Sequence, residues 1–214
     1  MQNSVSRKAA WWVSMILNPF VVPPIIFGLV AHSNGMEGQA LGQIIGIATF
    51  LYFIIPVVYL VVLLRLKAID SLEARDKSKR QAPMYWGAFW VIIAIPIMIW
   101  FSNGSPFVFG LIGGVLALNA VLLAVINRQL KISIHVAGVS GLFSILLALL
   151  LTHRIASDLL GTSFFAITLI AISLVAWARV HSNAHHLKEV FLGALFGLFV
   201  PIAEIYLVSL IWGH

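Results

Sequence analysis

The sequence predicts an all-α protein, a polytopic bundle of about six to seven membrane-spanning helices. Of its 214 residues, 61% are hydrophobic and only 9% are charged, and the mean hydropathy is +1.04. This composition leaves too few polar side chains to cover a globular surface in water. Because backbone amides in lipid must be paired within the protein, long apolar runs are expected to be helical. We expect one integral membrane domain over residues 1–214.

Seven apolar runs have the composition of a spanning helix, which needs roughly 20 mostly apolar residues. They cover residues 11–31, 41–66, 84–101, 106–126, 136–152, 162–178 and 190–212. The first run contains Asn18-Pro19 and Pro23-Pro24. Each proline removes a backbone donor, so a break or kink is expected there. The fifth and sixth runs are the shortest, and the number of spans would fall if one of them were re-entrant.

The charges of the connecting segments predict an orientation. With seven spans, the N-terminus and the links at 67–83, 128–135 and 179–188 lie on one side of the membrane. This side carries twelve of the Lys and Arg residues, and Arg154 alone lies on the other. Because positive residues are retained inside, this face is expected to be cytoplasmic, in a bacterial or archaeal plasma membrane. Basic loops that only contact anionic headgroups are an alternative explanation. No nucleic-acid partner is expected.

The densest polar cluster, residues 178–189, lies between two apolar runs. Ionisable side chains at the edge of a bilayer are costly, so their presence indicates a functional site. If residues 181–189 are helical, His181, His185 and Glu189 follow one another at i,i+4 on one face. The cluster therefore predicts a reactive histidine beside a carboxylate.

The two other polar links on the same side each carry unusual residues. Ser133 and His135 begin an apolar run, where free backbone amides can point at an anion. The link at 67–83 is a run of charges that contains Arg80 and ends at Pro83, which is expected at a helix entrance. Together the three links predict a site for an anionic lipid headgroup.

Phosphoryl transfer is the chemistry that uses these residue types. It needs cations around the phosphoryl oxygens, a nucleophile in line with the breaking bond, and a proton donor for the leaving oxygen. His185, oriented by Glu189, can be the nucleophile, and His135 can be the acid. The surrounding cations are Arg80, Lys131 and Arg179. No metal is required for this assignment of roles.

These residues resemble the signature of the type 2 phosphatidic acid phosphatases, which has three parts: K-x6-R-P, P-S-G-H and S-R-x5-H-x3-D. Arg179 and His185 have the spacing of the third part, and Glu189 stands at the position of its Asp. Ser133 and His135 match the Ser and His of the second part. The chain is therefore similar to this family, as a divergent member.

The chain departs from the signature at several positions. Ala178, Ile132 and Ile134 replace a Ser, a Pro and a Gly. Arg80 is similar to the Arg of the first part, but Glu73 stands where that part has its Lys, so Arg75 or Lys77 would take over its role.

The resemblance implies a role for each residue. His185 attacks phosphorus and forms a phosphohistidine, Glu189 orients it, and His135 protonates the leaving group. The implied phosphate ligands are Arg80, Arg179 and Ser133, with Lys131 and Lys77 beside them. The family is helical, embedded in the membrane and independent of metals or other cofactors. Its substrates are lipid phosphates or diphosphates, such as phosphatidic acid or an isoprenoid diphosphate, and the sequence does not choose among them.

Two other functions fit parts of the pattern. A metal-dependent membrane hydrolase would use His181, His185, Glu189 and His135 as zinc ligands, because i,i+4 histidines suit a tetrahedral site. A transporter would line a path with its intramembrane ionisable residues, but here these residues gather at one face. Phosphatase and phosphotransferase also remain open, as does the oligomeric state.

Overall fold

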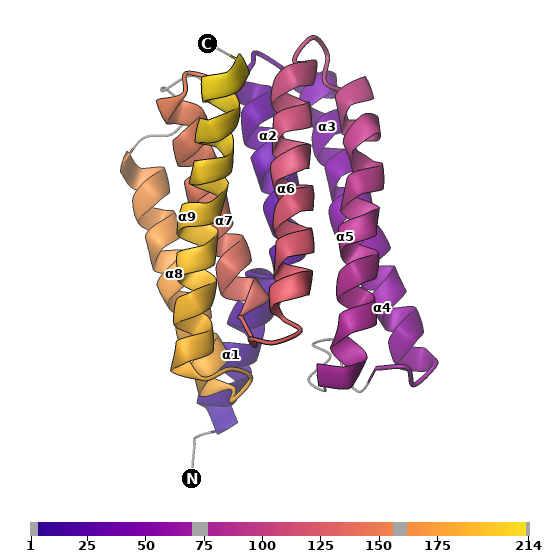
Figure 1. Ribbon diagram of the computed structural model, residues 1–214, viewed down its shortest axis with the longest axis vertical. Helices are drawn as coiled ribbons and strands as arrows, with labels where there is room; N and C mark the ends of the chain where they lie inside the picture. The colour runs from indigo at the N-terminus through magenta and orange to yellow at the C-terminus, as the bar shows by residue number, and fades with distance from the viewer. Residues whose placement is uncertain (1–3, 70–76, 156–161, 213–214) are drawn as a thin grey trace. The chain divides into compact units, whose positions relative to one another are not determined.

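The computed structural model describes residues 4–69, 77–155 and 162–212, and in these residues the regular structure is helical, without a β-strand. The helices are α1 (Ser4–Ile16), η1 (Pro19–Val21), α2 (Val22–Ser33), α3 (Gly38–Thr49), η2 (Phe50–Ile54), α4 (Ile55–Arg65), α5 (Lys77–Trp100), α6 (Pro106–Ile126), α7 (Ile134–Leu151), α8 (Thr162–His181) and α9 (Leu187–Trp212). Figure 1 labels α1 to α9 along the chain.

Seven helical segments of the described residues are long and apolar enough to cross a membrane. They are Ser6–Ser33, Gly38–Arg65, Lys79–Trp100, Pro106–Ile126, Ile134–Leu151, Ser163–His181 and Leu187–Trp212. The all-α, polytopic prediction is thus confirmed, and the two shortest runs are full-length helices. The chain is an integral membrane protein.

The first span breaks where its sequence predicts a break. Helix α1 ends at Ile16, and the side chain of Asn18 accepts a hydrogen bond from the Phe20 amide at 3.0 Å. This bond begins the short 3-10 helix η1, whose first residue is Pro19. Pro19 lacks an amide hydrogen, so it fits the first position of a helix, where that hydrogen would have no partner.

The chain folds as two compact units. The first, which we call unit 1, contains Met1–Val22 and Ile132–His214, and unit 2 contains Pro23–Lys131. In unit 1, α7 contacts η1, α8 and α9, while α1 packs on α8. Figure 1 shows α7 beside α9 in this unit. Valines from α7, α8 and α9 form a buried core cluster: Val136, Val139, Val175 and Val190.

Helices α7 and α9 of unit 1 run in the same direction and are joined near both their starts and their middles. The Ser133 amide donates to the Glu189 carbonyl at 3.1 Å, before α7 and in the first turn of α9. Further along, the Ser144 hydroxyl donates to the Gly197 carbonyl at 2.6 Å. Such interhelical hydrogen bonds in membrane proteins contribute about 1 kcal/mol each. The starts of the two helices are therefore held at one end of unit 1.

Unit 2 contains a π-helical turn, η2, within the second span. A π turn interrupts the regular backbone pairing of an α-helix. The Trp90 indole of α5 donates to the Leu51 carbonyl in this turn at 2.8 Å, which satisfies an acceptor that lipid could not. The aromatic contacts Phe27–Tyr52 and Phe27–Phe109 pack α2 against η2 and α6. The regular helix expected over residues 41–66 is therefore interrupted.

The expectation that Pro83 stands at a helix entrance is wrong. Helix α5 begins at Lys77, so Pro83 lies inside it. Pro83 cannot donate to the Lys79 carbonyl one turn earlier. Lys79 is exposed, and water can satisfy that carbonyl beyond the edge of the membrane. The charged residues before Pro83 thus extend the helix past the apolar span.

Candidate active site

The turn between α8 and α9 fixes the spacing of Arg179 and His185. Asn183 has a φ of +54°, in the left-handed region that asparagine tolerates better than most residues. The Arg179 carbonyl accepts hydrogen bonds from the amides of Ala184 at 3.2 Å and His185 at 3.1 Å. The Asn183 amide also donates to the Val180 carbonyl. This bond and the one from Ala184 to Arg179 together form a Schellman motif, which ends α8. The backbone of His185 is therefore tied to that of Arg179, whose side chain is buried.

Glu189 holds both the side chain of His185 and the start of α9. Its Oε2 atom is 2.7 Å from His185 Nδ1 and accepts the His186 amide at 3.2 Å. Because the His186 carbonyl accepts from the Val190 amide, His186 is the N-cap of α9 and Glu189 is its third helical residue. A glutamate at that position bonds back to the N-cap amide in a capping box. The carboxylate is thus fixed by the helix that it caps.

His185 and Glu189 are largely shielded from solvent. Their side chains are 9% and 17% exposed. The neighbouring His186 is exposed and meets Glu189 through its backbone. A carboxylate facing Nδ1 favours the tautomer with hydrogen on Nδ1, so Nε2 carries the lone pair. The pair can therefore present Nε2 as a base or a nucleophile, with a negative charge behind it.

The start of α7 is next to His185 and Glu189, because the Ser133 amide donates a hydrogen bond to the Glu189 carbonyl. Ser133 is the N-cap of α7 and is fully buried, and its hydroxyl has no hydrogen-bond partner among the described residues. His135 is the second residue of α7 and is half-buried. The first amides of a helix have no partner within it and attract anions. Unit 1 thus brings Ser133, at the positive end of α7, beside Glu189.

Residues 181–189 do not form one helix, so the condition under which His181 would share a face with His185 and Glu189 is not met. Helix α8 ends at His181, and the turn at Asn183 separates it from α9. His181 Nε2 lies 3.0 Å from the Ser6 hydroxyl of α1, and its ring stacks on Trp177 at 5.2 Å between centroids. Within the described part of the chain, no three His, Asp or Glu residues form a group that could hold a metal ion.

The other predicted phosphate ligands belong to unit 2. Arg80 is buried in the first turn of α5, and its Nη2 donates to the Asn127 carbonyl at 3.4 Å. Asn127 caps the C-terminus of α6, where a cation stabilises the helix dipole. Lys131 is half-buried before α7, and the side chain of Lys77 lies outside the described residues. The phosphate-binding roles of these cations stay predictions.

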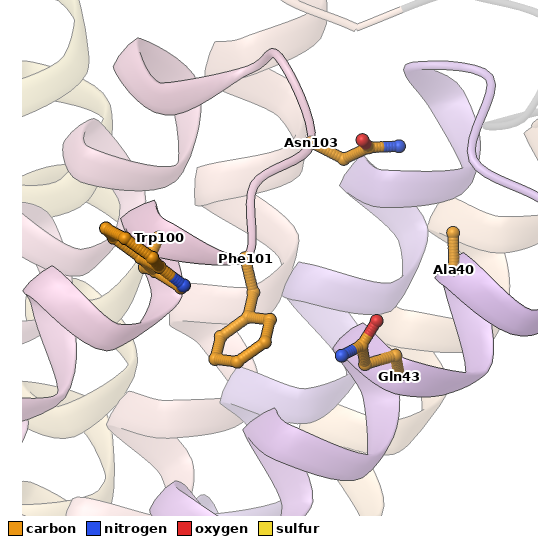
Figure 2. Close-up of a pocket in the computed structure, with 5 residues that line it drawn as sticks. All are labelled: Ala40, Gln43, Trp100, Phe101 and Asn103. Atoms are coloured by element: carbon orange, nitrogen blue, oxygen red, sulfur yellow. The ribbon is translucent and has the colours of Figure 1, made fainter.

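A shallow hollow of about 200 Å³ lies at the opposite end of unit 2 from Arg80, and none of the predicted site residues lines it. Its lining comes from α3 and from the end of α5 with the turn that follows: Ala40, Gln43, Trp100, Phe101 and Asn103. Figure 2 shows the Gln43 amide extending toward the Phe101 ring. The lining carries no charged or nucleophilic side chain, so we assign no chemistry to it.

Two structural features of the site were missed from the sequence, although each has a sequence signal. Asn183 follows Ser182, and asparagine after an apolar periodic run is a helix stop signal. Glu189 stands three residues after His186, the spacing of a capping box. Reading these signals would have divided residues 181–189 into the end of one helix and the start of the next.

Comparisons with known protein families, curated proteins and solved structures identify no relative of this chain. A proposal about function therefore rests on the geometry of the residues in unit 1.

Proposed function

We propose that this membrane protein hydrolyses a lipid phosphate or diphosphate through a phosphohistidine on His185, as a divergent relative of the type 2 phosphatidic acid phosphatases. The observation that carries the proposal is the 2.7 Å contact between His185 Nδ1 and Glu189 Oε2, at the end of a spanning helix. A histidine oriented by a carboxylate is an activated nucleophile. The hydrogen bond from the Ser133 amide to the Glu189 carbonyl holds the start of α7 next to this pair. It therefore supports a role for Ser133 and the first amides of α7 in binding the same anion.

In the proposed reaction, His185 Nε2 attacks phosphorus and the bond from phosphorus to the leaving oxygen breaks. His135 donates a proton to that oxygen, which departs as a lipid alcohol or a lipid monophosphate. Water then attacks the phosphorus of the phosphohistidine, loses a proton to His135, and releases phosphate with the neutral imidazole. Glu189 stabilises the positive charge that the imidazole carries while phosphorylated. Arg179 and Ser133 take the phosphate-binding roles that the family resemblance implies.

The proposed substrate keeps its apolar tail in the membrane and brings its phosphate to the polar end of the spans. This position suits a substrate that does not dissolve in water. The excess of twelve Lys and Arg residues against one predicts that this end faces the cytoplasm. We therefore propose a cytoplasmic site in a plasma membrane.

Phosphate release from lipid phosphates by the purified protein tests the proposal. Phosphatidic acid and an isoprenoid diphosphate in mixed micelles serve as substrates, each with and without EDTA. We expect phosphate release in both conditions, and acid-labile ³²P on the protein after quenching with labelled substrate. His185→Ala should show neither. Activity that EDTA abolishes would support a metal-dependent hydrolase instead, and no release from any lipid phosphate would refute the proposed function.

A further inference from the structure

Helix α9 meets the backbone of α7 at two glycines one turn apart, Gly193 and Gly197. A Cβ atom on Gly193 would lie 2.6 Å from the Ser133 carbonyl oxygen and 3.4 Å from the Ser133 Cβ. One on Gly197 would meet the Ala137 carbonyl and lie 2.7 Å from the Ser140 Cβ. The G-x-x-x-G spacing lets the backbones of membrane helices approach closely. The approach here places α9 against the first turn of α7.

The Ser133 carbonyl that Gly193 contacts cannot move aside by itself. It accepts the Ala137 amide at 2.9 Å, which is the first hydrogen bond of α7. The Ser133 amide, on the other side of the same residue, donates to the Glu189 carbonyl. A side chain at Gly193 would therefore have to displace the start of α7 or the start of α9. Either shift would change the position of Ser133 relative to Glu189.

We propose that Gly193 is a positioning residue of the candidate active site. Its missing side chain lets α9 lie on the Ser133 carbonyl. That contact sets the distance between the starts of α7 and α9. Ser133 and His135 lie at the start of α7, and His185 lies just before α9. The role rests on the proposed phosphatase function, because it concerns the geometry of that site. Gly193 itself touches neither the substrate nor the reacting atoms.

Gly141 provides a matched control within unit 1. It is also a buried helical glycine, in α7, but a Cβ atom there would have no other described residue within 4 Å, apart from the adjacent backbone of its own helix. Gly141→Ala and Gly193→Ala therefore make the same chemical change in the same unit. They differ in whether the added methyl group meets the backbone at the start of α7.

Steady-state kinetics on a lipid phosphate test the positioning role. A misplacement of about 1 Å in a catalytic group costs roughly a hundredfold in rate, so we expect Gly193→Ala to lower kcat by about that factor. KM should change by less than about threefold, because contacts with the apolar tail are kept. Gly141→Ala should keep the kcat of the unmodified protein. Equal kcat values in the two variants would overturn the proposal.

Hydrogen exchange of the Ser133 amide gives a readout that does not depend on activity. It can be followed by NMR in ¹⁵N-serine-labelled protein, with the Ser133 signal assigned from Ser133→Ala. We expect Gly193→Ala to speed exchange at Ser133 by about tenfold or more, since the bond to Glu189 opens more often. Gly141→Ala should leave it unchanged. Unchanged exchange in Gly193→Ala would refute the packing role, whatever the activity.

The two measurements separate failure of this inference from failure of the proposed function. If the unmodified protein releases no phosphate while Gly193→Ala speeds exchange, the packing role holds and the phosphatase assignment fails. If Gly193→Ala does not fold, Ser144→Ala takes its place. This variant deletes the bond from the Ser144 hydroxyl to the Gly197 carbonyl without adding atoms. Faster Ser133 exchange in Ser144→Ala would support the coupling of the two helices, and unchanged exchange would overturn it.

Discussion

Replacing Glu189 with glutamine separates the charge of this side chain from its role as a helix cap. The carboxylate contacts His185 Nδ1 at 2.7 Å and the His186 amide at 3.2 Å through the same oxygen. Glutamine has the same length and an oxygen that can accept both bonds, and it occupies the same position in capping boxes. Glu189→Gln should therefore keep the start of α9 and remove only the negative charge.

Two general magnitudes bracket the expected loss of catalysis. A hydrogen bond to a charged group is stronger than a neutral one by about 1–2 kcal/mol. Opposite unit charges about 4 Å apart attract by about 4 kcal/mol at an effective dielectric constant near 20. A loss near 3 kcal/mol lies between them, and each ~1.4 kcal/mol changes the rate tenfold. We therefore expect Glu189→Gln to lower kcat by roughly a hundredfold.

The assay compares kcat, KM and thermal stability of the purified variants on one lipid phosphate. Glu189→Gln should keep KM and lose less than about 1 kcal/mol of stability, since the cap is retained. Glu189→Asp should keep partial activity, because its charge remains but its side chain is one methylene shorter. Full activity in Glu189→Gln beside an inactive His185→Ala would refute the reasoning. Glu189 would then act only as a cap, and another group would orient the histidine.

Three further predictions concern the register of the site, its orientation and His181. His185→Ala should abolish phosphate release, whereas His186→Ala should retain most of it because the His186 side chain is exposed. The reverse ranking would show that His185 is not the histidine that matches the family's motif. In a chain without cysteine, a Lys79→Cys variant should react with an impermeant maleimide only after the cells are permeabilised. Labelling of intact cells would place this end outside. His181→Ala breaks the contact with Ser6, so it should lower the melting temperature while kcat stays within about threefold; a loss as large as that of His185→Ala would place His181 in the site.

The membrane spans follow from the sequence because their cause is local. An apolar run of sufficient length must form a helix in lipid, where each backbone group needs a partner within the segment. Proline acts within its own turn, so the break near Asn18 was also predictable. The start of α5 at Lys77, before Pro83, was not predicted, because a proline is ordinarily expected in the first turn of a helix. Hydropathy describes the apolar part of a helix and gives no information about its polar end.

The candidate site divides in the same way. The pairing of His185 with Glu189 was expected from the i,i+4 spacing of one helix. It is present in the structure, but His185 lies before the first residue of α9, and Glu189 reaches it from within that helix. The separation of His181 from that pair depends on one left-handed residue, Asn183. A residue with a positive φ changes the direction of the chain. Residues on its two sides therefore do not share a helix face, even when their spacing in the sequence is helical. The residue types predict a site for phosphoryl transfer, and one backbone angle decides that His185, and not His181, lies beside Glu189.

The sequence by itself determined the helical membrane class, the seven spans and the local partners of the candidate nucleophile, because each of these depends on residues close together in the chain. Only the tertiary structure decided that Ser133 bonds to Glu189, that Gly193 lies on the Ser133 carbonyl, and that Arg80 donates to Asn127. These contacts join residues far apart in the chain. Their geometry depends on how closely two helix backbones approach, and that distance is set by packing.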